Sequence, residues 1–278
     1  MPSVRIDSPE DPRIEAYLNI RERDLAGRQG RFVAEGKVVL DVMLSGRRFE
    51  AESALVLENR LSGLEKILQK APPDLPVYVV SSTVMDAIAG FHMHRGVLAI
   101  GRKRSEDTPR RLVEDLPPRA TVVVAVGITN HDNVGAIFRN AAAFGADAVL
   151  LDRTSCDPLY RKAIRVSVGA ALKVPFAIGG DGAELVGLLS QHGFRQLALS
   201  PAGKSDLRAV TRPERLALYL GTEGEGLPAD LLGRLETVRI AMTPGFDSLN
   251  VAAASAVALH HLSDLEPVSD QLPRPAAP

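Results

Sequence analysis

Three glycines and two carboxylates fall within one short loop of this 278-residue chain. The loop reads Gly-Thr-Glu-Gly-Glu-Gly over residues 221–226 and follows the apolar run 216–220. Glycines let the main chain approach a ligand closely, and the carboxylates favour a hydroxyl, amine or cationic ligand over a phosphate. The spacing differs from the G-x-G-x-x-G of dinucleotide-binding loops and lacks the Lys-Ser/Thr of a P-loop. The alternative is a connecting turn with solvated glutamates.

A second polar group begins the last expected helix, over residues 249–262. The sequence Ser248-Leu249-Asn250 leads into Ala, Val and Leu residues, and we expect Ser248 to cap this helix. Capping does not explain Asn250, because Asn is a poor helix former inside a helix. Its position indicates a role beyond helix formation.

A third polar group lies on an expected helix over residues 134–144. Asn133 precedes this helix and Gly145 follows it, which is the ordinary pattern of an Asn N-cap and a Gly at C′. Arg139 is flanked by alanines, Ile137 and Phe138, where a lone cation costs energy unless it pairs or reaches a cleft. A helix N-terminus with one Arg suits an anion. A surface ion pair is the alternative.

In their order, these three groups resemble the motifs of the SpoU (TrmH-type) branch of the SPOUT RNA methyltransferases. The resemblance covers about residues 122–262. The segment before it, including residues 32–36 and 94–97, is similar to the family's small substrate-binding domain. The resemblance implies an α/β fold, in which a C-terminal parallel-sheet SPOUT domain with a trefoil knot follows a small α/β substrate-binding domain. It also implies a homodimer through the catalytic domain.

The activity that the resemblance implies is methyl transfer from S-adenosylmethionine to a ribose 2′-hydroxyl of RNA. The expected catalytic residues are Arg139, Asn133, Glu223, Ser248 and Asn250. The expected cofactor-binding residues are Leu199, Ser200, Gly221, Gly224, Ile240, Met242 and Leu249. Because a guanidinium stays protonated, we expect Arg139 to bind a phosphate beside the target ribose and to stabilise the developing alkoxide. Asn133 and Glu223 would orient Arg139, while Ser248 and Asn250 would position the RNA and the knot.

RNA contacts are expected from basic residues in the first half of the catalytic domain. These are Arg153, Arg161, Lys162 and Arg165. Arg161, Lys162 and Arg165 lie about one turn apart on an expected helix over residues 159–168, which would form a track for phosphates. The arginines at 21, 23, 28 and 31 are balanced by Glu22 and Asp24, and a solvated helix face is the simpler interpretation there.

Composition narrows the class of protein. The formal net charge is −1 and aromatic residues make up 4% of the chain, which argues against wholesale nucleic-acid coating and against an aromatic stacking platform. The only cysteine, Cys156, allows neither an internal disulfide nor a cysteine-based zinc site. No metal site is expected. Because we find no secretory or membrane-spanning segment, we expect a cytoplasmic protein.

Strands alternate with helices after residue 120, which predicts a parallel sheet covered on both faces. The expected strands there cover residues 121–126, 148–151, 174–177, 196–199, 216–220 and 237–240. The first segment is expected to hold strands at 54–57, 77–80 and 97–100, and helices at 14–25, 37–44 and 63–70. We expect an N-terminal RNA substrate-binding domain (1–103), a linker (104–118), a methyltransferase domain (119–266) and a disordered tail (267–278).

The preferred substrate is ribosomal RNA, because a separate N-terminal recognition domain suggests a structured target. Transfer RNA is the alternative within the same class. A protein that keeps the fold and binds RNA without transferring methyl groups is the alternative from another class, although the intact catalytic set argues against it. A small-molecule methyltransferase is disfavoured by the basic residues at 161, 162 and 165.

Overall fold

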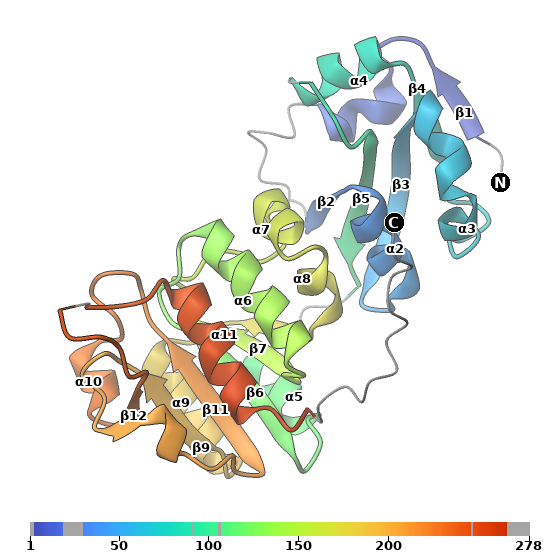
Figure 1. Ribbon diagram of the computed structural model, residues 1–278. Helices are drawn as coiled ribbons and strands as arrows, with labels where there is room; N and C mark the ends of the chain where they lie inside the picture. Colours follow the sequence, from blue (N-terminus) through green and yellow to red (C-terminus); the bar gives the residue numbers. More distant parts are fainter. Residues whose placement is uncertain (1–2, 19–29, 91, 105–106, 246, 266–278) are drawn as a thin grey trace, which may run out of the picture.

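The strands of the protein form two separate sheets (Figure 1). The computed structural model describes residues 3–18, 30–90, 92–104, 107–245 and 247–265. The first sheet, called here the N-terminal sheet, has the order β1-β4-β3-β5-β2. β1, β4 and β3 are parallel, while β5 runs antiparallel to β3 and β2. Its strands are β1 (Ser3–Ile6), β2 (Arg31–Glu35), β3 (Phe49–Leu57), β4 (Val77–Val80) and β5 (Val97–Lys103).

Helices cover both faces of the N-terminal sheet. Buried side chains of η1 and α4 pack on one face, with Tyr17 and Met85 fully buried. Buried side chains of α2 and α3 pack on the other face. The helices are η1 (Pro12–Tyr17), α2 (Lys37–Ser45), η2 (Glu58–Leu64), α3 (Glu65–Leu68) and α4 (Ser82–Ala89). The expected helix over 14–25 is a short 3₁₀ helix at its start, and most of the remainder lies outside the described residues.

The second sheet, the C-terminal sheet, is entirely parallel, as the alternating pattern predicts. Its order is β10-β12-β9-β11-β6-β7-β8. Every residue of β6 is buried, which is expected of a strand covered on both faces. The strands are β6 (Ala120–Ala125), β7 (Ala148–Leu151), β8 (Phe176–Ile178), β9 (Arg195–Leu199), β10 (Ser205–Asp206), β11 (Arg215–Leu220) and β12 (Glu236–Arg239).

The alternation of side chains along β6 separates two helical layers. Val123 packs in the cluster that contains α6 and α11, whereas Val122 and Val124 pack in the cluster that contains α5, α9 and α10. The expected linker thus holds the helix α5, whose Leu112 and Val113 are buried in that second cluster. The helices are α5 (Pro109–Glu114), α6 (His131–Ala143), α7 (Arg161–Val166), α8 (Ala170–Lys173), α9 (Gly182–Gln191), η3 (Leu207–Ala209), α10 (Ala229–Leu232) and α11 (Val251–Leu262).

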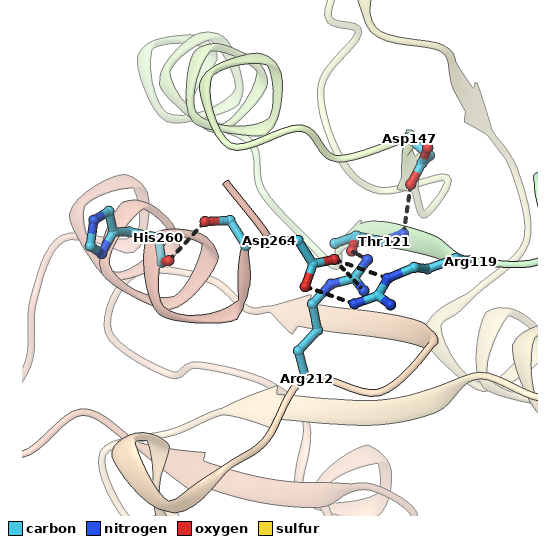
Figure 2. Close-up of polar contacts among 7 residues, drawn as sticks. Arg119, Thr121, Asp147, Arg212, His260 and Asp264 are labelled. Atoms are coloured by element: carbon cyan, nitrogen blue, oxygen red, sulfur yellow. Dashed lines mark hydrogen bonds and ion pairs between the residues drawn. The ribbon is translucent and has the colours of Figure 1, made fainter. Parts of the chain in front are cut away.

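The end of α11 is fixed by a carboxylate just beyond it (Figure 2). Asp264 accepts hydrogen bonds from Nε and Nη2 of Arg119 at 3.0 and 2.7 Å, in the bidentate geometry of a strong pair. Arg212 Nη1 lies 2.7 Å from the same carboxylate, and its Nη2 donates to the hydroxyl of Thr121 in β6. These contacts join the C-terminus of α11 to the start of β6 in the C-terminal sheet.

Two arginines hold the two sheets together. Arg161, at the start of α7, pairs with Glu35 at the end of β2, with N···O at 2.8 Å. Their side chains are 17% and 6% exposed, and burial lowers the pKa of the Arg161 guanidinium while Glu35 acts in the opposite direction. Arg48, before β3, donates to the backbone carbonyls of Val174 and Phe176 beside the edge strand β8. The apolar core also runs from one sheet into the other.

We predict that Glu35→Gln destabilises the protein by about 3 kcal/mol, because it removes the carboxylate that compensates a buried guanidinium. Urea unfolding followed by circular dichroism measures the change. The matched control is Glu35→Leu combined with Arg161→Met, which removes both charges and is expected to recover most of the loss. A single variant as stable as the wild type would show that the pair contributes nothing.

Candidate functional site

A cavity of about 300 Å³ opens at the carboxyl ends of β9, β11 and β12, next to the start of α11. Carboxyl ends of parallel strands are the usual place for ligands in open α/β sheets. The lining combines apolar side chains with glycine backbone and a few polar groups. It consists of Leu199, Ser200, Pro201, Leu220, Gly221, Thr222, Glu223, Gly224, Gly226, Ile240, Met242, Ser248, Leu249, Asn250, Val251 and Ala254.

The glycine loop after β11 closes on itself. Thr222 and Gly226 exchange backbone hydrogen bonds of 3.2 and 3.1 Å. A Cβ at Gly221 would lie 2.4 Å from the backbone of Gly226 and Leu227, so no larger residue fits there. Gly224 and Gly226 have φ of 93° and 74°, a region that favours glycine. The glycines therefore shape the loop, which then presents Glu223 to the cavity.

Asn250 connects three parts of the site. Its Oδ1 accepts hydrogen bonds from the backbone N–H of Ala252 and Ala253 at 2.9 and 3.3 Å, so Asn250 is the N-cap of α11. Its Nδ2 donates to Asn133 Oδ1 at 3.0 Å and also to Glu223 Oε1. One carboxamide thus joins the helix start, the glycine loop and α6.

Both expected helix starts need correction. The last helix begins at Val251 and its cap is Asn250, so the expectation that Ser248 caps it is wrong. Ser248 is exposed in the loop before the helix, at the rim of the cavity. Likewise α6 begins at His131 and is capped by Asn130, not by Asn133. Asn133 is buried in the first turn of α6. Its side chain does not cap the helix and instead accepts a hydrogen bond from Asn250.

Arg139 has a different environment from the expected one. Its side chain is exposed on the outer side of α6, so the expected cost of burial among apolar residues does not arise. It does not line the cavity, and within the described residues we find no hydrogen bond or ion pair to it. In the single chain, Asn133 and Glu223 contact Asn250 and not Arg139.

The basic residues of α7 do not form one free phosphate track. Arg161 is engaged with Glu35, and Lys162 pairs with Asp132 at 2.6 Å. Arg153 lies 3.2 Å from Glu184. Arg165 is half-buried at the end of the helix. The Arg161 side chain is 17% exposed and pairs with Glu35, and its expected contact with RNA stays a prediction.

All seven residues expected to bind the cofactor line the cavity. So do three of the five expected catalytic residues, namely Glu223, Ser248 and Asn250. Asn133 joins them through Asn250, while Arg139 stands apart. Their roles stay predictions.

Sequence reasoning overlooked Asn140, which supports the site from α6. Its Nδ2 donates to the carbonyl of Ala252 at 2.8 Å and to the hydroxyl of Ser255 at 2.9 Å. Asn140 follows Asn133 by seven residues, which places both side chains on one helix face. The seven-residue spacing was therefore a sequence signal that Asn140 faces the same neighbour as Asn133.

The remaining metal-ligating and nucleophilic side chains of the described residues form no second site of this kind. Within the described residues, no group of three His, Cys, Asp or Glu side chains gathers as a metal site would require. Burial and the nearby Asp157 raise the pKa of the Cys156 thiol to about 11. Among the described helices, none has the length and apolar character needed to cross a membrane.

Comparisons with known proteins agree on the class. The model of the SpoU rRNA Methylase family matches residues 120–260. An uncharacterized tRNA/rRNA methyltransferase of Mycobacterium bovis is 39% identical over 261 residues, covering 91% of this chain and 88% of the relative. The crystal structure of an RNA 2′-O ribose methyltransferase is 29% identical with a TM-score of 0.73, covering 93% of this chain and 98% of that chain. An AdoMet-bound rRNA methyltransferase from Sinorhizobium meliloti shares the fold, at 22% identity, a TM-score of 0.78, and coverage of 94% and 97%.

The chain belongs to the SpoU rRNA methylase family of RNA methyltransferases. Its α/β fold with a parallel sheet matches the SPOUT methyltransferases, as the motifs predict. The trefoil knot stays a prediction.

We predict that Asn250→Asp lowers methyl transfer about 100-fold, in the range expected when a positioned group is displaced. The substitution keeps the helix cap, but it removes both Nδ2 hydrogen bonds and places a second carboxylate against Glu223. Asn250→Ser is the matched control, because it keeps a cap and adds no charge. Single-turnover kinetics and thermal melts measure both variants. Full activity of the Asp variant would exclude this network from the reaction.

Proposed function

We propose that the protein is an S-adenosylmethionine-dependent methyltransferase that modifies a ribose 2′-hydroxyl, with ribosomal RNA as the preferred substrate. The observation that carries the proposal is the Asn133–Asn250–Glu223 network at the mouth of the glycine-loop cavity. The name of the similar RNA 2′-O ribose methyltransferase supports the reaction, and the family description supports the substrate.

The cavity suits S-adenosylmethionine in size and in chemistry. Its volume of about 300 Å³ lies at the lower end of small-molecule sites. Leu199, Ile240 and Leu249 offer apolar walls for a nucleoside, while the loop residues Gly221 and Gly224 offer backbone groups. Glu223 offers a carboxylate, which suits a ligand with cationic groups. When bound, the cofactor supplies a methyl group already activated by its sulfonium.

The residues of the chain then position the acceptor. A carboxylate has about four lone-pair sites, so Glu223 can accept a hydrogen bond from a ribose hydroxyl as well as from Asn250. Ser248, exposed at the rim, is placed to contact the RNA. The Arg139 guanidinium binds the phosphate next to the target ribose and stabilises the ribose oxygen, which gives its proton to solvent water as it takes the methyl group.

A second cavity supports RNA recognition by the N-terminal domain. It has a volume of about 530 Å³ and lies beside the start of α2. Four of its lining residues, Lys37, Arg60, His94 and Arg95, carry or can carry positive charge. Val38, 57% exposed, adds an apolar contact surface. This combination suits phosphates and splayed bases of a structured RNA.

The proposed assembly is a cytoplasmic homodimer through the catalytic domain. The outer sides of α6 and α11 expose Arg139, Ala253 and Val257, and Leu249 is 39% exposed at the cavity. A second copy on this side would cover the apolar groups and bring another chain close to Arg139.

We predict that Val257→Asp, at a position 45% exposed, converts the dimer to a monomer, because a charge in an apolar interface is desolvated without a partner. Light scattering after size-exclusion chromatography measures the mass. Val4→Asp, on the edge strand β1, is the control and is expected to remain dimeric. A wild-type monomer would overturn the proposed assembly.

The reaction is tested by transfer of a labelled methyl group to separated rRNA and tRNA from cells that lack the protein. We expect label on a ribose of rRNA, and at least 100-fold less with Arg139→Ala, whose cofactor affinity stays unchanged because Arg139 does not line the cavity. Label in tRNA alone would identify tRNA, and not rRNA, as the substrate. Cofactor binding without label in either fraction would favour a binding protein, and loss of cofactor binding in the variant would make Arg139 structural.

A further inference from the structure

A third cavity lies where the two sheets meet, on the side of the edge strand β8. It has a volume of about 420 Å³, and we call it the junction pocket. The ends of β3 and β5 form one wall and β8 forms the other. The residues that line it are Arg47, Arg48, Phe49, Lys103, Arg104, Asp107, Phe176, Ala177 and Ile178.

The charge of the junction pocket is strongly unbalanced. Four of its lining residues are cationic and one, Asp107, is acidic, in a chain whose net charge is −1. Asp107 pairs with Arg48 at 2.9 Å, and Lys103 faces Asp157 at 3.9 Å. Arg47 and Arg104 are exposed, and no ion pair to either occurs within the described residues. Like charges held this close repel one another, so the pocket favours an anionic ligand.

Arg48 lies at the centre of the pocket and is held by several partners. Arg48 donates to two carbonyls and to Asp107, and its guanidinium lies 4.9 Å from the centroid of the Phe176 ring and 5.6 Å from that of Phe49. Both rings are buried, at 4% and 5% exposure. Arg48 is therefore fully engaged within the protein. The exposed pair, Arg47 and Arg104, remains for a ligand at the mouth.

We propose that the junction pocket binds phosphodiester groups of the RNA substrate, with Arg47 and Arg104 as the contacting residues. Arginine forks match phosphate oxygens in geometry and charge, and phosphate contacts fix the register of a nucleic acid without reading its sequence. The assignment of the anion as RNA rests on the proposed function.

The pocket is a remote anchor and not part of the catalytic cavity. Three strand spacings separate β11, which carries the glycine loop, from β8, or roughly 14 Å across the sheet. An RNA held at both places must reach from β11 to β8 across the C-terminal sheet. The junction pocket thus adds phosphate contacts outside the nucleotide that is modified.

The test compares Arg47→Gln/Arg104→Gln with Arg5→Gln/Arg208→Gln. The control pair carries the same charge and is 64% and 78% exposed, on β1 and η3, but its arginines are paired with Asp7 and Asp206. Binding of deproteinised ribosomal RNA is measured between 50 and 200 mM salt without methyl donor. The variant lacks two phosphate contacts, so we expect the negative slope of log K against log salt to become shallower by about 1.5. We also expect its affinity at low salt to be about tenfold lower. The control is expected to match the wild type.

An unchanged slope would overturn the proposal. Calorimetry with inorganic pyrophosphate separates the two phosphate sources: pyrophosphate binding lost in the variant, with an unchanged RNA slope, would assign the pocket to a free polyphosphate. If the RNA-binding slope is unchanged and pyrophosphate does not bind, the junction pocket would be assigned to an acidic protein surface. Because binding is measured without transfer, a wild type that binds RNA but transfers no methyl group would overturn the proposed function alone.

Discussion

The side-chain amide of Asn250 is the contact that joins the elements around the cavity beside the glycine loop. Its oxygen accepts from the first N–H groups of α11, and its nitrogen donates to Asn133 and Glu223. Turning the amide over would set N–H groups against N–H groups, so its orientation is fixed by its partners. A helix start, a buried asparagine and a loop carboxylate are therefore held together before any ligand arrives. Such preorganisation is what a transfer reaction requires of a protein that supplies position and not covalent chemistry.

The two helices joined by Asn250 keep this geometry along their length. α6 and α11 begin at the same edge of the sheet, and Asn140 links them again one to two turns further, through Ala252 and Ser255. Beyond the last turn, Asp264 binds Arg119 and Arg212 and so ties α11 to the start of β6. Because both helices start near Glu223, the positive ends of their dipoles favour its negative charge. Contacts near both ends of α11 therefore hold this helix in place beside the cavity.

The elements that bury apolar runs were the most predictable part of the fold. The bounds of β4 and β7 agree with the expected 77–80 and 148–151, because short apolar runs between turn residues leave little choice. Helix starts were less predictable. Asn130, Asn133, Ser248 and Asn250 are all favourable caps, and tertiary hydrogen bonds decide which of them does the capping. Arg139 shows the same limit: its apolar neighbours in sequence face the core, whereas its own side chain leaves from the other side of the helix.

The arginines show why a basic cluster in sequence does not locate an RNA-binding surface. Arg161 and Arg48 have carboxylate partners, and they hold the two sheets against each other. Breaking the Arg161–Glu35 pair leaves a buried charge uncompensated, and the resulting loss of stability would also lower RNA binding. An exposed guanidinium without a carboxylate, such as that of Arg47 or Arg104, contributes little to stability. Its removal changes the field that an approaching phosphate meets and leaves the fold intact. Burial and counter-charge, read from the structure, therefore separate the arginines that position the domains from those that contact a substrate.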